Sequence, residues 1–185
     1  PASVCVSVNE EVVHGIPGNR VLKEGDIVAI DVGSIYNGFQ GDAAVTVGVG
    51  RISQEARALI ETTRGALECG VEVARVGAHL GDVSAAIQRY VEERGFSVVR
   101  EYVGHGIGRE MHEPPQIPNY GTPGQGPILR EGMTLALEPM VNLGDWRTKV
   151  LPDGWTVVTA DGSLSAHFEH TIAITSSQAE VLTRL

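Results

Sequence analysis

Two histidines stand in a stretch rich in glycine and proline, "EYVGHGIGREMHEPPQIP" over residues 101–118. His105 has a glycine on either side, and His112 follows it by seven residues. A histidine that only fills core space is normally surrounded by apolar side chains, whereas glycines leave room where the backbone approaches a ligand closely. Because imidazole can bind a metal or transfer a proton near neutral pH, this stretch leaves a structural histidine and a ligand-binding histidine both open.

Four carboxylates stand in segments that otherwise look like β-strands, where each would be costly to bury alone. They are Asp31 in "VAIDVG", Asp42 in "FQGDAAV", Glu138 in "LALEPM" and Glu169 in "AHFEHTIAI". A single acid of this kind often faces solvent on an antiparallel sheet, but a solvated face does not predict four of them in separate strands. Together with His105 they form an oxygen-rich set with one nitrogen donor, which is typical of sites for one or two divalent ions.

The turn at Asn37–Gly38 determines how two of these acids lie. If this turn pairs Tyr36 with Phe39, residue 31 lies opposite residue 44, and Asp31 and Asp42 become diagonal neighbours on one face, ~7–8 Å apart. Like charges placed in this way must take up a proton or be neutralised by cations. The hairpin therefore predicts either an acid–base pair or a metal site.

Further elements must position these residues. A hairpin over residues 25–50 is followed by a helix that begins after Ser53 and ends before Gly70, and by a second helix that opens at Asp82 and is closed by Gly95. Alternating apolar residues predict strands at 4–8, 96–103, 132–141, 155–160 and 167–174. Pro139 should hold Glu138 in an extended conformation. We expect residues 114–127, which are rich in proline, to form an ordered loop near the site rather than a linker.

Composition and charge limit the possible partners. The 185 residues suffice for one domain, and the net charge of −9 argues against nucleic acid and anionic membrane surfaces. No apolar run approaches the ~20 residues that span a bilayer, and the first residues do not resemble a signal peptide. Cys5 and Cys69 are too few for a disulfide framework. These observations predict a cytoplasmic protein.

Six features in order resemble type I methionine aminopeptidases along essentially the whole chain. They are "NEEVVHGIP", "GDIVAIDVG", the eleven-residue step from Asp31 to Asp42, "GHGIGREMHEPPQIP", "GMTLALEPMV" and "SAHFEHTIAI". The resemblance implies the pita-bread fold, an α+β domain with pseudo-twofold symmetry whose mostly antiparallel central sheet is backed by helices. It also implies that the chain is a single metallopeptidase catalytic domain over residues 1–185 that lacks the family's N-terminal segment.

The resemblance further implies a role for each acid. Asp31 would chelate one ion, Asp42 and Glu169 would bridge the two ions, and His105 and Glu138 would complete the coordination of the other ion. The expected cofactors are two divalent ions, Co, Mn, Fe or Zn. Two such ions can hold a shared hydroxide and polarise the scissile carbonyl, with Glu138 as the proton shuttle.

Substrate contacts follow from the same resemblance. His112 and His14 would contact the substrate as catalytic histidines, while Cys5, Met111 and Trp155 would line the methionine pocket. We expect His167 and His170 to support a neighbouring ligand or to face solvent rather than to bind the ions themselves. The implied activity is removal of the N-terminal methionine from nascent chains whose second residue is small. We expect a monomer that acts on nascent N-termini, and the ribosome stays open as a further partner.

Other functions must be weighed against this one. A proline-directed aminopeptidase or prolidase would have the same fold, and a fragment without its first helices could bind metal and be inactive. A non-catalytic peptide-binding module of the fold typically loses metal ligands, whereas all five are present here. A dinuclear phosphohydrolase is disfavoured because the glycines of "GHGIG" surround a histidine and do not open a helix.

Overall fold

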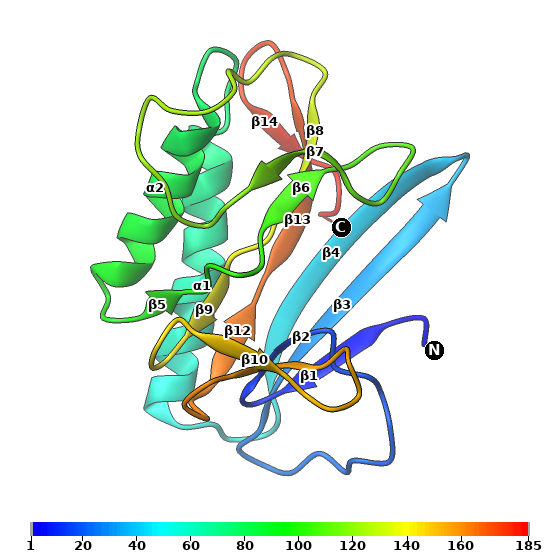
Figure 1. The fold of residues 1–185 in the computed structure, drawn as a ribbon, viewed down its shortest axis with the longest axis vertical. Coiled ribbons are helices and arrows are strands. Elements are labelled where there is room, and N and C mark those ends of the chain that lie inside the picture. The colour runs from blue at the N-terminus through cyan, green and yellow to red at the C-terminus, as the bar shows by residue number, and fades with distance from the viewer. Residues whose placement is uncertain (1, 185) are drawn as a thin grey trace.

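In the computed structural model, which describes residues 2–184, a curled, mostly antiparallel sheet carries two helices side by side on one face (Figure 1). The main sheet has eight strands, in the order β1-β3-β4-β13-β8-β6-β7, with β14 also paired to β13. These strands are β1 (Cys5–Val8), β3 (Ile27–Tyr36), β4 (Phe39–Gly48), β13 (Glu169–Ile174), β8 (Thr134–Leu137), β6 (Gly104–Gly106), β7 (Glu113–Ile117) and β14 (Ala179–Val181).

Two three-stranded sheets complete the β structure. One has the order β10-β11-β2 and the other the order β12-β9-β5. Their strands are β2 (Glu11–Val13), β5 (Ser97–Val98), β9 (Met140–Asn142), β10 (Thr148–Val150), β11 (Val157–Thr159) and β12 (Ser165–His167). The strand predicted over residues 96–103 is therefore reduced to two residues, and the loop predicted over 114–127 begins inside a strand, β7.

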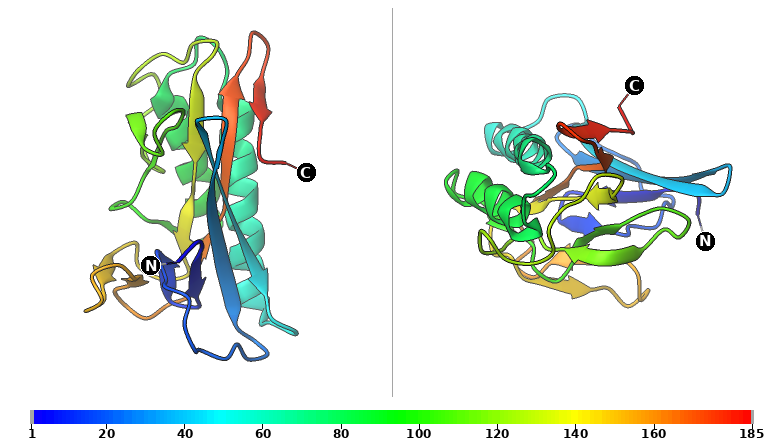
Figure 2. Two further views of the ribbon diagram at one scale, coloured as in Figure 1. Left: turned by 90° about the vertical axis from the view of Figure 1, so that its right-hand side faces the viewer. Right: turned by 90° about the horizontal axis from the view of Figure 1, so that it is seen from above.

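Both helices cover the sheet with their apolar faces. Helix α1 (Gln54–Val73) begins at Ser53, whose hydroxyl accepts a hydrogen bond from the Ala56 N–H at 3.1 Å, as predicted. Its apolar face packs with that of α2 (Leu80–Glu92) on strand residues such as Leu135 and Ile172. Figure 2 shows the two helices on the same side of the sheet, with the β3–β4 hairpin projecting away from them.

Two predicted helix boundaries were wrong. Helix α1 continues through Gly70 to Val73. Gly70 is a point of close contact with α2 and not a helix end, since a Cβ there would lie 2.9 Å from Cδ1 of Ile87. Asp82 lies inside the first turn of α2, where its carboxylate accepts a hydrogen bond from the His79 N–H at 2.8 Å. Acids in this position stabilise the unpaired N–H groups of a helix start, which explains why Asp82 resembled a cap.

The predicted hairpin is confirmed in its register. Asn37 and Gly38 have φ values of 50° and 79°, as a tight hairpin turn requires, and Tyr36 pairs with Phe39. Asp31 consequently lies opposite Ala44. The hairpin therefore places Asp31 and Asp42 on one face of the sheet.

Two strands predicted as continuous are broken. The segment 132–141 ends as β8 before Glu138 and resumes as β9 after Pro139, in a different sheet, and the segment 167–174 divides at Phe168 between β12 and β13. Because Pro139 has no N–H to continue the ladder, β8 can end there, and Glu138 lies in the break instead of a strand.

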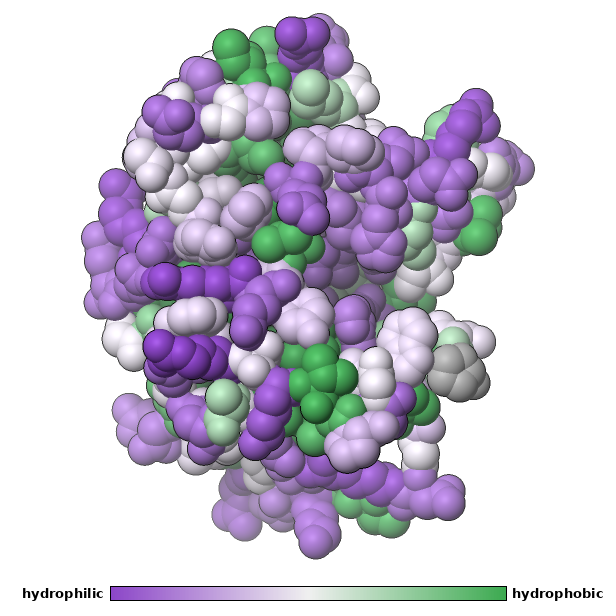
Figure 3. Space-filling view, viewed as in Figure 1, coloured by the Kyte–Doolittle hydropathy of each residue, from purple (hydrophilic) through white to green (hydrophobic). Residues whose placement is uncertain are grey.

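The surface seen in Figure 3 is mostly hydrophilic, with small apolar patches, and it is hollowed beside the projecting hairpin. In residues 2–184, no helix has the length and apolar character needed to cross a membrane. Cys5 and Cys69 are both free thiols.

Candidate metal centre

The four strand carboxylates and His105 converge on one cavity of about 260 Å³. Each comes from a different part of the sheet: Asp31 from β3, Asp42 from β4, His105 from β6, Glu169 from β13 and Glu138 from the break after β8. His14, His112, Met111 and Cys5 line the same cavity. The tertiary structure thus collects residues that are up to 164 positions apart, from Cys5 to Glu169.

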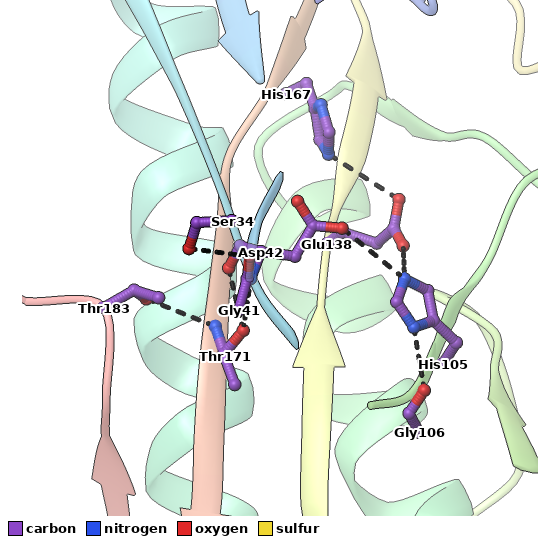
Figure 4. Close-up of polar contacts among 9 residues, drawn as sticks. All are labelled: Ser34, Gly41, Asp42, His105, Gly106, Glu138, His167, Thr171 and Thr183. Carbon is purple, nitrogen blue, oxygen red and sulfur yellow. Dashed lines mark hydrogen bonds and ion pairs between the residues drawn. The ribbon is translucent and has the colours of Figure 1, made fainter. Parts of the chain in front are cut away.

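The spacing within this group suits a cation. One ligating atom each from Asp42, His105 and Glu169 lies within 4.8 Å of the other two. Nε2 of His105 is 3.5 Å from Oε1 of Glu138 and 4.0 Å from Oδ2 of Asp42, as Figure 4 shows. Donor atoms at these separations are close enough to share one ion and too far apart to satisfy one another fully.

Burial makes this cluster electrostatically unfavourable by itself. Desolvation, reinforced by the charge of Asp42, raises the pKa of Asp31 to about 7. Desolvation followed by the neighbouring carboxylates also raises the pKa of Glu138 and of Glu169. Burial lowers the pKa of His105, so its imidazole is neutral near pH 7 and has a lone pair to donate.

The cluster has the features of an incomplete coordination shell. Oε1 of Glu169 is buried with no hydrogen-bond partner, and within residues 2–184 no Lys or Arg forms an ion pair with any of the four acids. Buried charges are normally paired or bound to metals. Carboxylates with one neutral imidazole match the donor set of a divalent transition metal, so the residues present fit such an ion.

The glycines beside His105 do not make room for a ligand, contrary to our reading of the sequence. A Cβ at Gly104 would lie 2.4 Å from the Ala136 carbonyl oxygen of β8, and one at Gly106 would lie 2.3 Å from the Pro114 carbonyl oxygen. Both glycines therefore allow β6 to fit between β8 and β7. The glycines thus allow His105 to lie on a strand that both neighbouring strands approach closely.

Two more histidines lie at the cavity. The His112 ring is 4.3 Å from that of His105, centroid to centroid, and tilted by 56°. His14 has a φ of 60° and meets Tyr102 and Trp155 edge-on, at 5.8 Å and 6.2 Å between ring centroids. Burial and the charge of His112 lower the pKa of His14. Both imidazoles are thus placed beside the acids without being among their nearest partners.

The expected pocket residues lie in different places. Met111 projects over Gly33, and a Cβ added at Gly33 would lie 2.5 Å from the Met111 Cε. Cys5, on β1, lies opposite Asp31 on β3. Burial and the charges of Asp31 and Asp42 raise the pKa of the Cys5 thiol. Trp155 is 56% exposed and is not among the cavity residues, so it contacts the site through His14.

Two further residues lie beside Glu138, and only one of them, His167, was expected near a ligand. His167 is buried with its Nε2 unpartnered, 3.7 Å from Oε2 of Glu138, while His170 instead faces Thr183. Asn119 donates a hydrogen bond from its side chain to the Glu138 carbonyl at 3.0 Å. The sequence shows that His167 stands two residues before Glu169, but the strand break at Phe168 determines where the His167 side chain points.

A larger hollow of about 710 Å³ lies over α1 and β14. It is lined by dispersed charged groups, among them Glu68, Glu72 and Arg184. The smaller cavity is the better candidate because unpartnered carboxylate and imidazole groups converge in it.

Comparisons with known proteins agree with this geometry. The model of metallopeptidase family M24 matches residues 1–176. The chain is 59% identical to a methionine aminopeptidase of Clostridium perfringens and 58% identical to methionine aminopeptidase 1 of Bacillus subtilis, over 99% of this chain and 74% of each relative. A crystal structure of methionine aminopeptidase from Thermotoga maritima superposes with a TM-score of 0.97 at 60% identity, covering 98% of this chain and 74% of that one. A prolidase from Pyrococcus furiosus, at 24% identity and a TM-score of 0.80, shares the fold alone.

Proposed function

We propose that the buried cluster of this chain, which belongs to metallopeptidase family M24, removes methionine from the N-terminus of a peptide. The relatives that are 57–59% identical over 99% of the chain are methionine aminopeptidases, as the sequence motifs predicted, so the activity is that of an aminopeptidase, a hydrolase. The pita-bread fold expected from the motifs is confirmed by the same likeness to solved structures. On this proposal, residues 1–185 form one catalytic domain.

The observation that carries the proposal is the buried group of Asp42, His105 and Glu169, whose ligating atoms lie within 4.8 Å of one another while Oε1 of Glu169 has no partner. The family implies a divalent metal, and we propose two ions. Asp31 would hold the first ion and His105 with Glu138 the second, while Asp42 and Glu169 would contact both. When bound, such ions supply a hydroxide nucleophile near neutral pH and polarise the scissile carbonyl.

The remaining residues bind, orient and exchange protons. His112 lies beside His105 and would donate a hydrogen bond to the scissile carbonyl or amide. His14 packs edge-on against Tyr102 and would also contact the substrate. The Glu138 carboxyl, whose pKa burial raises, would carry the proton from the attacking water to the leaving amine.

The pocket restricts the substrate by its size. The cavity of about 260 Å³ that the acids line has room for one side chain, and Met111 offers a thioether surface for a methionine. We propose that the second residue of the substrate must be small, and that nascent chains supply such N-termini.

The experiment that tests the proposal measures methionine release from Met-Ala-Ser by the metal-stripped chain during titration with Mn²⁺ or Co²⁺, with ion stoichiometry measured in parallel. Metal-dependent release with about two ions bound per chain is expected. Glu169→Gln should abolish release, while Glu180→Gln, in the half-exposed strand β14, should leave it unchanged as the matched control.

Three outcomes would contradict the proposal in different ways. Release of the first residue from an Xaa-Pro peptide in preference to Met-Ala-Ser would indicate a proline-directed enzyme. Metal binding without release would show that the chain holds ions but is inactive. A single ion bound at saturation with full activity would overturn the dinuclear arrangement.

A further inference from the structure

The strands that carry Asp42 and Glu169 are paired over only two residues. Between β4 and β13, the backbone ladder consists of Glu169 opposite Ala44 and His170 opposite Ala43. Continuing the same register by one residue places Thr171 opposite Asp42, and continuing it in the other direction places Thr46 opposite His167. The two acids that would contact both ions therefore depend on a short seam.

A threonine hydroxyl replaces the backbone ladder at each end of this seam. Thr171 Oγ1 accepts a hydrogen bond from the Asp42 N–H and donates one to the Asp42 carbonyl, both at 2.9 Å. Figure 4 shows Thr171 beneath Asp42 with these contacts drawn. Thr46 Oγ1 makes the same pair of contacts with His167: it accepts a hydrogen bond from the His167 N–H at 2.9 Å and donates one to the His167 carbonyl at 2.7 Å. We call these the two threonine clamps.

The clamps are located where β13 changes its neighbours. Beyond Thr171, β14 takes the place of β4 beside β13, and the Thr171 N–H and carbonyl bond Thr183 and Leu182 instead. On the other side, β13 begins at Glu169 after the break at Phe168, and β12, which precedes this break, belongs to a different sheet. At both places the backbone of β4 does not pair directly with the facing backbone, so the threonine hydroxyl is the hydrogen-bond partner of the N–H and carbonyl groups there.

Both hydroxyls are also buried. Thr46 is 2% exposed and Thr171 is 3% exposed, so water cannot readily substitute for either of them. Without its threonine, each clamped residue would lose the partner of its N–H and of its carbonyl, and at His167 both of these groups are buried. The Thr171 clamp bonds both the N–H and the carbonyl of Asp42, which lie on either side of its Cα. It therefore fixes the position of Asp42 and also satisfies its backbone hydrogen bonds.

We infer that Thr171 and Thr46 are positioning residues that hold the Asp42 and Glu169 carboxylates at the separation a metal ion requires. This inference rests on the proposed metal centre. Partners behind a metal ligand typically change metal affinity about 10–100-fold when removed. The hydroxyls act through the backbone of β4 at Asp42 and of β12 at His167, two residues before Glu169, and neither acts on the substrate directly.

The test compares metal affinity among single variants of the whole chain, by titration of the metal-free proteins with Mn²⁺. Thr171→Val and Thr46→Val keep the side-chain shape but lose the hydroxyl, and each should weaken binding at least about tenfold. Thr171→Ser keeps the hydroxyl and should bind within about threefold of the unchanged chain. Thr63→Val is the matched control: its hydroxyl is also buried and bonds a backbone carbonyl, that of Leu59 at 2.7 Å, but within α1.

Affinity in Thr171→Val or Thr46→Val equal to that of Thr63→Val would overturn the inference. Amide hydrogen exchange needs no variant and decides the matter if the valine chains do not fold. The Asp42 and His167 N–H groups should exchange as slowly as their ladder neighbours, and fast exchange at both would show that the clamps do not hold. If the unchanged chain binds no metal, the proposed function fails, while exchange still tests the clamps separately.

Discussion

Nε2 of His167 lies 3.7 Å from Oε2 of Glu138, and Oε1 of the same carboxylate lies 3.5 Å from Nε2 of His105. Glu138 thus lies between two imidazoles, although it is in a strand break. Desolvation lowers the pKa of His167 to about 3, so this ring is neutral under ordinary conditions. A neutral imidazole can orient the carboxyl without adding charge.

His167→Leu should therefore reduce kcat for Met-Ala-Ser about 10–100-fold with little change in KM, because the shuttle carboxyl loses the buried imidazole that lies beside it. His167→Gln should retain most of the activity, since an amide can still hydrogen-bond. His79→Leu, which removes an imidazole at the start of α2, serves as the control in the same steady-state assay. Equal kcat in the leucine and glutamine variants would show that His167 has only a packing role.

The metal-free protein should become less stable as pH rises from about 6.5 to 7.5. Burial raises the folded pKa of Asp31 to about 7, so between about pH 4 and 7 the folded state retains a proton that the unfolded state has released, and this contribution to stability is lost as pH rises. The lowered pKa values of His105 and His167 act in the opposite direction, but only below about pH 6.5, where unfolded histidine takes up its proton.

Urea midpoints of the metal-free chain at pH 6.5, 7.0 and 7.5 measure this slope. Asp31→Asn should flatten it, whereas Asp153→Asn should not, because hydrogen bonds from Thr156 and Trp155 lower the pKa of Asp153 and keep it ionised throughout this range. With Mn²⁺ present the slope should reverse, since ions displace the protons. Stability of the metal-free chain that rises with pH would contradict the prediction.

Gly104→Ala should destabilise the fold by about 1–3 kcal/mol, as overpacking does. The added Cβ would meet the Ala136 carbonyl oxygen at 2.4 Å, and a backbone atom between two strands cannot move aside easily. Gly18→Ala is the control, because its Cβ would find only the Ile16 carbonyl oxygen, at 4.0 Å. The urea midpoint gives the comparison, and an equal effect of the two substitutions would show that β6 is not closely packed.

Met111→Ala should raise KM for Met-Ala-Ser by up to about tenfold while kcat changes little, because the side chain lines the cavity and takes no part in proton transfer. Met133→Ala is the matched control, since Met133 packs against the core and bonds the Arg130 N–H through its sulfur. An unchanged KM in Met111→Ala would place the methionine pocket elsewhere.

Several features of this protein could be predicted from local sequence. The Asn37–Gly38 turn determines the register of β3 and β4, and with it the shared face of Asp31 and Asp42, because a two-residue turn admits one pairing. Ser53 determines where α1 begins by bonding the N–H groups of its own first turn. The motifs also identified the family, since six of them occur in the same order along the chain.

Other features depended on contacts between distant segments, which no local pattern contains. Pro139 shows that β8 cannot continue, but only the two sheets on either side of it place Glu138 at the cavity. The same sheets turn His167 toward that carboxylate, and the glycines around His105 proved to accommodate neighbouring strands. Residue types therefore determined which groups could hold a metal, while the packing of β4, β13, β8 and β6 decided that those groups meet, because burial and separation are properties of the assembled sheet.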